Sequence, residues 1–288
     1  MNIEDNVKAF DAVSARYDSI ESEPAFKVLR SASLRHLLRT FRQGKIVLDI
    51  GCGTGTEAIA LAKQGVTVIG IDPSQGMIEQ AEKKKQKEKI SNAFFYRLSA
   101  HELAQVPAMS GFHRFDGAYS SLGSLNCEPI LEPVGQALSG LLHPEAFVVA
   151  SVFNTRCLAE MMVYAVIKPS RVFRRKGPFM AMQIGGQNVM LRLYSLNEIK
   201  DAFRDFKVQS TRALSFLVPP PHLSRRIPED ILQGLGILDS LTSRMWPFNR
   251  YGDYVSVTLK KQTINTERLS QNDDHGRRST RSSIQKKP

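Results

Sequence analysis

Residues 46–55, IVLDIGCGTG, constrain the fold more than any other stretch of this chain. The apolar first half of the segment is typical of a buried parallel strand. The alternating glycines Gly51, Gly53 and Gly55 let a backbone turn sharply and approach a ligand with no Cβ in the way. Good helix formers follow directly. The segment therefore predicts a strand, a glycine loop and a helix, the arrangement at which nucleotide-like ligands dock.

Two acidic residues decide between the ligands that such a loop can hold. The spacing Gly53-x-Gly55-x-x-Ala58 also fits a dinucleotide loop. Asp49, inside the strand, would repel a pyrophosphate but attract a ligand with a cationic centre. Asp72 ends the next apolar run, VTVIGID, where a carboxylate can accept hydrogen bonds from both hydroxyls of a ribose. A nucleoside with a cationic centre and no pyrophosphate is S-adenosylmethionine (SAM), which we predict as the cofactor.

Three motifs carry a resemblance to the class I SAM-dependent methyltransferases: VLDIGCGTG, GIDPSQGMIEQA and FDGAYSSLGSLNC. The resemblance spans roughly residues 5–155 and returns at 250–260. The opening FDAVSARYDSI resembles the N-terminal segment of the quinone-biosynthesis methyltransferases, and SSLGSLNC resembles a branch that acts on small molecules. Ser99 departs from the pattern, since many members have at that place an acid that faces the adenine.

Strands and helices alternate through the first half of the chain, which predicts an α/β, Rossmann-like doubly wound fold with a mostly parallel seven-stranded sheet. A capping box of Ser195 and Glu198 predicts a further helix beyond this half. The predicted strands cover 45–50, 66–71, 93–98, 115–119, 145–152, 187–194, 207–217 and 254–261, and the predicted helices cover 5–18, 24–41, 55–64, 74–88, 129–142, 156–167 and 195–206.

The chain divides into four predicted parts. We predict a SAM-binding Rossmann-like core over 1–154, the late part of the core sheet with two lid insertions over 155–250, a last core strand over 251–261, and a disordered basic tail over 262–288. The insertions, 156–176 and 216–248, follow the fifth strand and precede the last, so they should rise above the cofactor edge. Their apolar residues, such as Met161 and Met162, should line the acceptor pocket.

The candidate cofactor residues cluster where predicted strands end. Asp72 could instead serve only as a helix cap, Met77 as a core residue, and Tyr17 as a contact between the first helix and the sheet. Leu122 should lie at the methyl-transfer site, and Asn126 belongs either there or in a turn. The predicted cofactor-binding residues are Tyr17, Asp49, Gly51, Cys52, Gly53, Thr54, Gly55, Asp72, Pro73, Met77, Ser99, Ala100, His101, Ser120 and Ser121.

The net charge of +11 is local, and nucleic acid is not an expected partner. Five cations lie within residues 168–176, and residues 262–288 hold six cations against three acids. The Asn/Asp-Pro-Pro-aromatic motif of amino methylation is absent after the fourth strand, where SSLGSLN stands. Three scattered cysteines fit a reducing cytoplasm, and no Cys/His cluster has the spacing of a metal site. We therefore predict a cytoplasmic enzyme without a metal.

We predict methyl transfer from SAM to a small, hydrophobic organic acceptor, and we name no catalytic residue, because no acid–base pair stands out. One alternative is a non-catalytic SAM-binding or membrane-associated protein, since the apolar residues 156–167 run into a basic cluster and such a segment can lie on an anionic membrane. Another is a short-chain dehydrogenase, from Ser151, Tyr164 and Lys168. Chance spacing explains that motif, and Pro169 disfavours the helix it needs.

Overall fold

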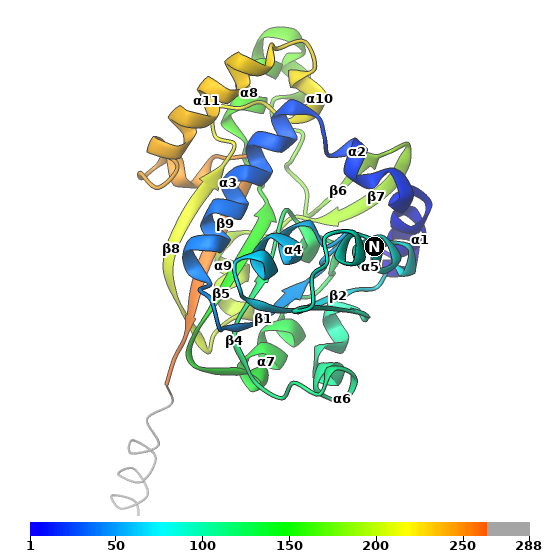
Figure 1. Ribbon diagram of the computed structural model, residues 1–288. Helices are drawn as coiled ribbons and strands as arrows, with labels where there is room; N and C mark the ends of the chain where they lie inside the picture. Colours follow the sequence, from blue (N-terminus) through cyan, green and yellow to red (C-terminus); the bar gives the residue numbers. More distant parts are fainter. Residues whose placement is uncertain (264–288) are drawn as a thin grey trace, which may run out of the picture.

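The computed structural model describes residues 1–263, whose main body is a seven-stranded sheet with helices on both faces (Figure 1). In sheet order its strands are β3 (Ala93–Arg97), β2 (Thr67–Asp72), β1 (Ile46–Ile50), β4 (Phe115–Ser120), β5 (Leu142–Phe153), β9 (Tyr254–Lys261) and β8 (Phe206–Leu214). The first five strands are parallel, and β9 runs antiparallel to both β5 and β8. The predicted Rossmann-like, mostly parallel seven-stranded sheet is confirmed.

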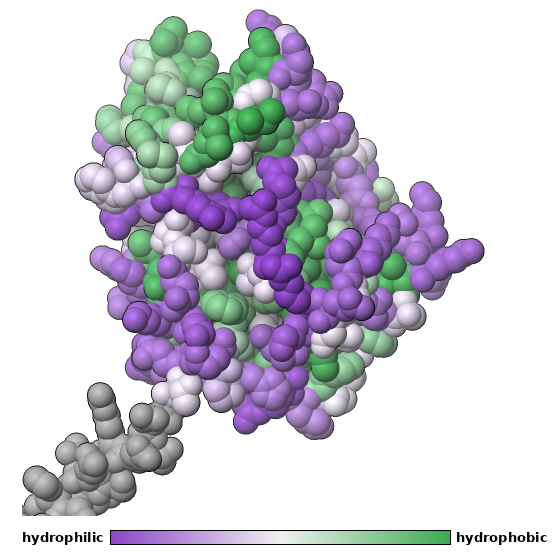
Figure 2. Space-filling model, turned by 60° about the vertical axis from the view of Figure 1, so that its left-hand side comes forward, coloured by the Kyte–Doolittle hydropathy of each residue, from purple (hydrophilic) through white to green (hydrophobic). Residues whose placement is uncertain are grey.

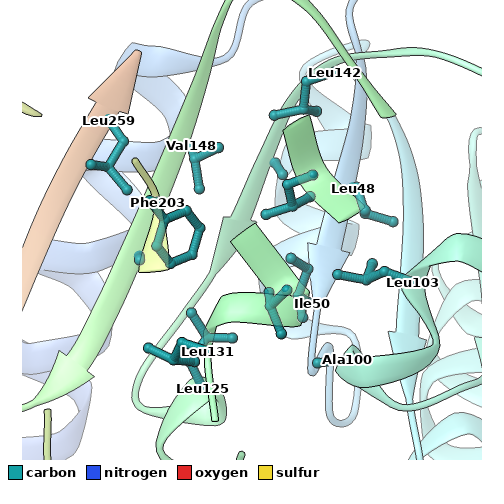
Figure 3. Close-up of a cluster of buried hydrophobic side chains, with 14 of the residues drawn as sticks. Leu48, Ile50, Ala100, Leu103, Leu125, Leu131, Leu142, Val148, Phe203 and Leu259 are labelled. Carbon is teal, nitrogen blue, oxygen red and sulfur yellow. The ribbon is translucent and has the colours of Figure 1, made fainter. Parts of the chain in front are cut away.

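Neighbouring residues of the central strands face opposite layers of helices, because side chains alternate along a strand. Val47 is buried against the first layer and Leu48 against the second. Figure 3 shows part of the second cluster, in which Val148 of β5 lies near Leu259 of β9 and Phe203. The first layer consists of α3 (Pro24–Thr40), α4 (Thr56–Lys63) and α5 (Gln75–Lys87), and the second of α6 (Val106–Ser110), α7 (Glu132–Leu141) and α9 (Leu196–Ala202).

A two-stranded hairpin outside the main sheet, β6 (Phe179–Ile184) with β7 (Gln187–Arg192), is the main departure from the predicted strands. The sequence predicted β7 as a strand, but it does not join the core sheet, and β6 was not predicted. β6 lacks a clear alternation of polar and apolar residues, FMAMQI. Gly185 and Gly186, with φ of +55° and +87°, form its turn, and this Gly-Gly pair was an available hairpin signal.

The N-terminal helices α1 (Ile3–Val13) and α2 (Tyr17–Ile20), joined by the 3-10 turn η1 (Ser14–Arg16), pack on this hairpin. The Asn6 side-chain amide donates to the Met190 carbonyl at 2.8 Å, and the Met190 backbone N–H donates to Asn6 Oδ1 at 2.9 Å. Arg16 donates to the Gly185 carbonyl at 2.6 Å. The beginning of the chain and a late insertion therefore form one cover above the sheet, as Figure 1 shows.

The remaining late elements gather at one end of the molecule, where Figure 1 places α8, α10 and α11 together. A buried Arg175 ties this region to β9, since its guanidinium pairs with Glu160 and donates to Asp253 Oδ1 at 2.7 Å. No helix within residues 1–263 has the length and apolarity that a membrane crossing requires. These elements and the short 3-10 turns are α8 (Leu158–Ile167), α10 (Pro221–Ser224), α11 (Glu229–Thr242), η2 (Ala100–Gln105), η3 (Ser124–Cys127), η4 (Pro169–Arg171) and η5 (Phe248–Arg250).

The predicted tail, 262–288, lies outside the described residues except for its first two. The Gln262 N–H donates to the Asp205 carbonyl at 3.0 Å, and the Thr263 hydroxyl donates to Glu145 at 3.0 Å. The last strand therefore continues its contacts slightly beyond the predicted end at residue 261.

Candidate functional site

A cavity of about 500 Å³ lies at the carboxyl edge of the parallel strands, where this type of sheet binds its ligands. Its lower wall contains the glycine loop after β1 and the end of β2. Its upper wall comes from α1, α2 and the β6–β7 hairpin, and α10 contributes a further side. Segments far apart in the sequence thus enclose one space directly above the predicted cofactor loop.

The glycine loop exposes its backbone to this cavity. Gly51 has φ of +73°, and a Cβ there would lie 2.3 Å from the Cβ of Ser124. Gly53 has φ of +51°, and a Cβ there would meet no atom within 4 Å. The space beside Gly53 is therefore open for a ligand to approach the main chain, which is the use of such glycines in nucleoside-binding loops.

Asp72 lies at the tip of β2 and lines the same cavity. Its Oδ2 accepts from the Gly53 N–H at 3.0 Å, and its Oδ1 accepts from the Ser74 N–H at 2.9 Å. Burial raises the pKa of this carboxyl to about 6. Each carboxylate oxygen retains a second lone pair, so Asp72 can hold the loop and still accept two hydrogen bonds from a ligand. Asp72 and the glycine loop therefore fit a nucleoside with two free ribose hydroxyls.

Seven of the predicted cofactor residues line the cavity together. Met77 is fully buried in α5 and also forms part of the cavity wall, so its position is compatible with either of its predicted roles. Leu122, expected at the methyl-transfer site, lines it as well. The seven residues are Tyr17, Gly51, Gly53, Asp72, Pro73, Met77 and Ala100.

Asp49 does not reach the cavity. Its side chain is buried beneath the loop on the same strand face as Val47, and its Oδ2 accepts from the Tyr119 hydroxyl at 2.8 Å. Burial, together with the nearby Glu57, raises the pKa of Asp49 well above its usual range. The structure thus corrects the expectation that this side chain meets the cationic centre of the ligand, because strand alternation turns it toward the α3–α4 side.

Ser99 and His101 also lie outside the cavity lining. The Ser99 hydroxyl caps η2 in a capping box and donates to Glu102 Oε2 at 2.7 Å, so it is already engaged. His101 is half-exposed, with Nδ1 3.6 Å from Glu128 Oε2. Only Ala100, between them, lines the cavity. Ser99 is thus engaged in a helix cap, and His101 pairs with the buried Glu128, which itself lines the cavity.

The other predicted residues outside the lining support the loop from behind. Thr54 donates to Asp18 Oδ1 of α2 at 2.6 Å, which ties the loop to the N-terminal helices. The Ser121 hydroxyl shares a hydrogen bond of 2.9 Å with Ser33 of α3. Asn126 is fully buried and donates to the Arg192 carbonyl at 2.7 Å, so of its two predicted roles the structure favours the turn. Cys52, Gly55 and Ser120 are likewise away from the lining.

Glu21 is a cavity residue that sequence reasoning missed. It follows α2, is buried, and forms an ion pair with Arg30 of α3, whose Nε also lies 3.3 Å from Glu57. Burial raises the pKa of Glu21 to about 7, and the nearby Glu57 carboxylate adds to this rise while Arg30 opposes it. No local motif marks such a residue; only the packing of α2 against α3 brings it to the cavity.

The wall opposite the glycine loop is mostly apolar. Phe10 and Phe26 of the N-terminal helices and Met182 and Ile184 of the hairpin all line the cavity and pack against the same buried apolar cluster. Met161 and Met162 are absent from the wall, and Met162 is exposed. The expectation that these two methionines line the acceptor pocket is therefore wrong. Residues 1–20 and the hairpin take their place, while 156–176 contributes Arg174.

The structure does not support a dehydrogenase site or a metal site. None of Ser151, Tyr164 and Lys168 lines the cavity, and the Tyr164 hydroxyl instead lies 3.4 Å from His222 Nε2, so the dehydrogenase interpretation lacks its site. Within residues 1–263, one group of potential metal ligands comes together, Cys157, Glu160 and Asp253. The Arg175 guanidinium pairs with both of those carboxylates, and Arg174 pairs with Glu160 as well, so two cations already balance the two negative charges.

A methyltransferase domain model matches residues 41–190, just over half of the chain. The chain is 31% identical over 118 residues, 41% of its length, to a Geobacillus protein that is itself inferred to be a methyltransferase. It is 28% identical over 134 residues, 46% of its length, to the ubiquinone biosynthesis O-methyltransferase of Acinetobacter baylyi. These matches cover 45% and 52% of the two relatives, so the chain spans about half the length of the curated relatives it matches.

Solved structures share the fold. A protein of Listeria monocytogenes inferred to be a SAM-dependent methyltransferase superposes with a TM-score of 0.54 at 18% identity, over 81% of this chain and 96% of that one. The 1,6-didemethyltoxoflavin-N1-methyltransferase of Burkholderia thailandensis gives 0.50 at 20% identity, over 89% and 88%. The family model covers just over half of the chain, so the chain belongs to the methyltransferase domain family, and it shares the fold of solved S-adenosylmethionine-dependent methyltransferases.

Proposed function

We propose that this protein transfers the methyl group of SAM to a small, hydrophobic organic acceptor. One observation carries the proposal: a single cavity joins the glycine loop and Asp72 on one side to a mostly apolar wall on the other. A polar acceptor would leave its own groups without partners against Phe10, Phe26, Met182 and Ile184, which is costly. A hydrophobic acceptor with one reactive polar group matches this lining better.

The chain's own residues have three tasks in this proposal. Asp72 holds the ribose, and the backbone at Gly53 lets the cofactor lie close to the loop. Bound SAM supplies a methyl group already activated on a sulfonium. The apolar walls exclude water and hold the acceptor in line with that group, so most of the rate enhancement comes from positioning.

We further propose that Glu21 removes the proton from the reacting hydroxyl or amine of the acceptor. Its carboxyl lines the cavity and ionises near neutral pH, which suits a general base for a hydroxyl or amine. Arg30, beside it, stays charged and orients the carboxylate. Bases of this kind contribute on the order of 10²–10⁴-fold to a rate.

Product analysis with methyl-labelled SAM tests the proposal. Phenolic acceptors with apolar tails should be methylated faster than polar amines of similar size. Filling the apolar wall with Met182→Trp should raise the acceptor KM and leave SAM affinity unchanged, because Met182 faces the cavity away from the loop. Phe179→Trp, on the same strand but exposed and outside the lining, is the matched control. Methylation of none of the acceptors, with normal SAM binding, would favour a non-catalytic SAM-binding protein instead.

A further inference from the structure

One end of the molecule carries an unusually apolar exposed surface, which we call the apolar face. It is defined by Val166 and Ile167 at the end of α8, Ile237 and Leu241 of α11, and Met245 and Trp246 just beyond α11. Val166 is 84% exposed and Trp246 is 76% exposed. Figure 2 shows apolar side chains gathered at this end, and Figure 1 places α8, α10 and α11 there.

Helix α11 shows why this surface is not ordinary. Its inner side buries Leu232 and packs on α3, as expected of a helix on a globular domain. Its outer side, however, presents Ile237, Leu238 and Leu241 to solvent, where a surface helix normally has polar residues. Within residues 1–263 no element covers these side chains. Exposed apolar patches of this kind usually mark a surface that meets a partner or a membrane.

The charges around the apolar face indicate what it meets. Lys168 and Arg171 lie exposed directly after α8, and Arg226 and Arg244 lie exposed at either end of α11. Among the acids of α8 and α11, Glu160 and Asp239 are buried, and Asp239 accepts from the Leu217 N–H at 2.6 Å. Glu229 and Asp230 are exposed, but they lie in the first turn of α11, at the opposite end of the helix from Leu241, Met245 and Trp246. An exposed apolar surface bordered by cations is complementary to the headgroups and acyl chains of an anionic bilayer.

A second copy of the chain fits this face less well. In a two-fold dimer the same patch meets itself, which would bring the bordering cations of one copy against those of the other. We therefore propose that the apolar face docks peripherally on an anionic lipid bilayer.

The apolar face lies beside an opening of the cavity. His222 and Arg225 of the α10 region line the cavity and are exposed, so the cavity reaches the surface next to this face. A lipophilic acceptor would then enter from the bilayer without crossing water. This consequence rests on the proposed function, whereas docking itself does not require methyl transfer.

Trp246 provides a direct test, because it is the only tryptophan of the chain. The full-length protein is titrated with phosphatidylcholine vesicles that contain phosphatidylglycerol. We expect a blue shift of the Trp246 emission, quenching by brominated lipids, and co-sedimentation that weakens as salt is added. Vesicles of phosphatidylcholine alone should bind at least tenfold more weakly.

Two pairs of variants separate the apolar face from the rest of the surface. Ile237→Ser/Leu241→Ser should weaken vesicle binding at least tenfold, whereas Met109→Ser/Ile130→Ser, which are also exposed but lie outside the apolar face, should not. Lys168→Gln/Arg171→Gln should weaken binding to anionic vesicles about fivefold for each charge removed. Lys83→Gln/Lys87→Gln on α5 is the matched control for charge. Residues 264–288 are present in every variant, so differences belong to the face.

Three results would overturn the proposal. The Trp246 emission could stay unchanged with anionic vesicles. The face variants and their controls could bind vesicles equally well. Sedimentation velocity could show a dimer, without lipid, that Ile237→Ser/Leu241→Ser abolishes, and the face would then belong to a second copy of this chain.

Discussion

The replacement Asp72→Ala is the most direct test of the cofactor site. In the structure, each oxygen of Asp72 accepts one backbone N–H, from Gly53 and from Ser74. The two remaining lone pairs are free to accept from both hydroxyls of a ribose in the cavity. Alanine removes these acceptors and also breaks the hydrogen bond that holds the glycine loop at Gly53. Both changes should lower the affinity for SAM.

The magnitude follows from the two lost hydrogen bonds to a charged group. We expect a loss of roughly 2–4 kcal/mol in binding free energy, which is about 30- to 700-fold in Kd. Asp72→Asn keeps one acceptor oxygen and should fall between the wild type and Asp72→Ala. SAM affinity of the wild type should also rise with pH through about 6, because the raised pKa of Asp72 leaves it protonated, and a poorer acceptor, at lower pH.

Calorimetric titration with SAM and with its demethylated product measures these affinities. Asp116→Ala is the control, since Asp116 also accepts a backbone N–H, from Ile46 at 2.9 Å, but lies at the start of β4 away from the cavity. Its SAM affinity should match the wild type. Wild-type affinity for Asp72→Ala, or equal losses for Asp72→Ala and Asp116→Ala, would refute the assignment. Tighter binding of NADH than of SAM would refute the cofactor itself.

Three further changes test the base, the packing and the buried charge. Glu21→Gln should remove the rise of kcat/KM with pH around 7 and lower kcat by at least 100-fold, with SAM affinity kept; an unchanged pH profile excludes Glu21 as the base. Gly135→Ala places a Cβ 2.0 Å from the Ala202 carbonyl and should lower the free energy of unfolding by about 1–3 kcal/mol, whereas Gly140→Ala on the same helix meets no atom within 4 Å and should not. Arg175→Met leaves the buried Asp253 carboxylate without its ion-pair partner and should lower the free energy of unfolding by roughly 3–5 kcal/mol in denaturant unfolding; a stability equal to the wild type would contradict this account.

The alternation of strands and helices, and the identity of the cofactor loop, were predictable because their signals are local. An apolar run followed by alternating glycines specifies a strand and a loop within ten residues. The capping box of Ser195 and Glu198 specified the start of α9 in the same way. Asp72 could be placed beside Gly53 because the carboxyl ends of neighbouring parallel strands meet at one edge.

The direction of a side chain was harder to predict. Asp49 stands in the right segment, yet strand alternation turns it to the same side as Val47, and counting residues along the strand would have shown this. Ser99 was expected to face the cofactor, but its hydroxyl takes part in the capping box that it forms with Glu102, three residues later in the chain. Local hydrogen bonding of a serine competes with any role toward a ligand.

The sheet, the glycine loop and the place of the Asp72 carboxyl beside that loop follow from the sequence pattern, whereas long-range packing establishes what closes the cavity. Asn6 meets Met190 across 184 residues of chain, and no periodicity encodes such a contact. The same is true of Glu21, which α2 and α3 together bring into the wall. Short-range patterns fix secondary structure because they depend on neighbouring residues, but an acceptor pocket forms where distant segments pack, and that depends on the shape of the whole fold.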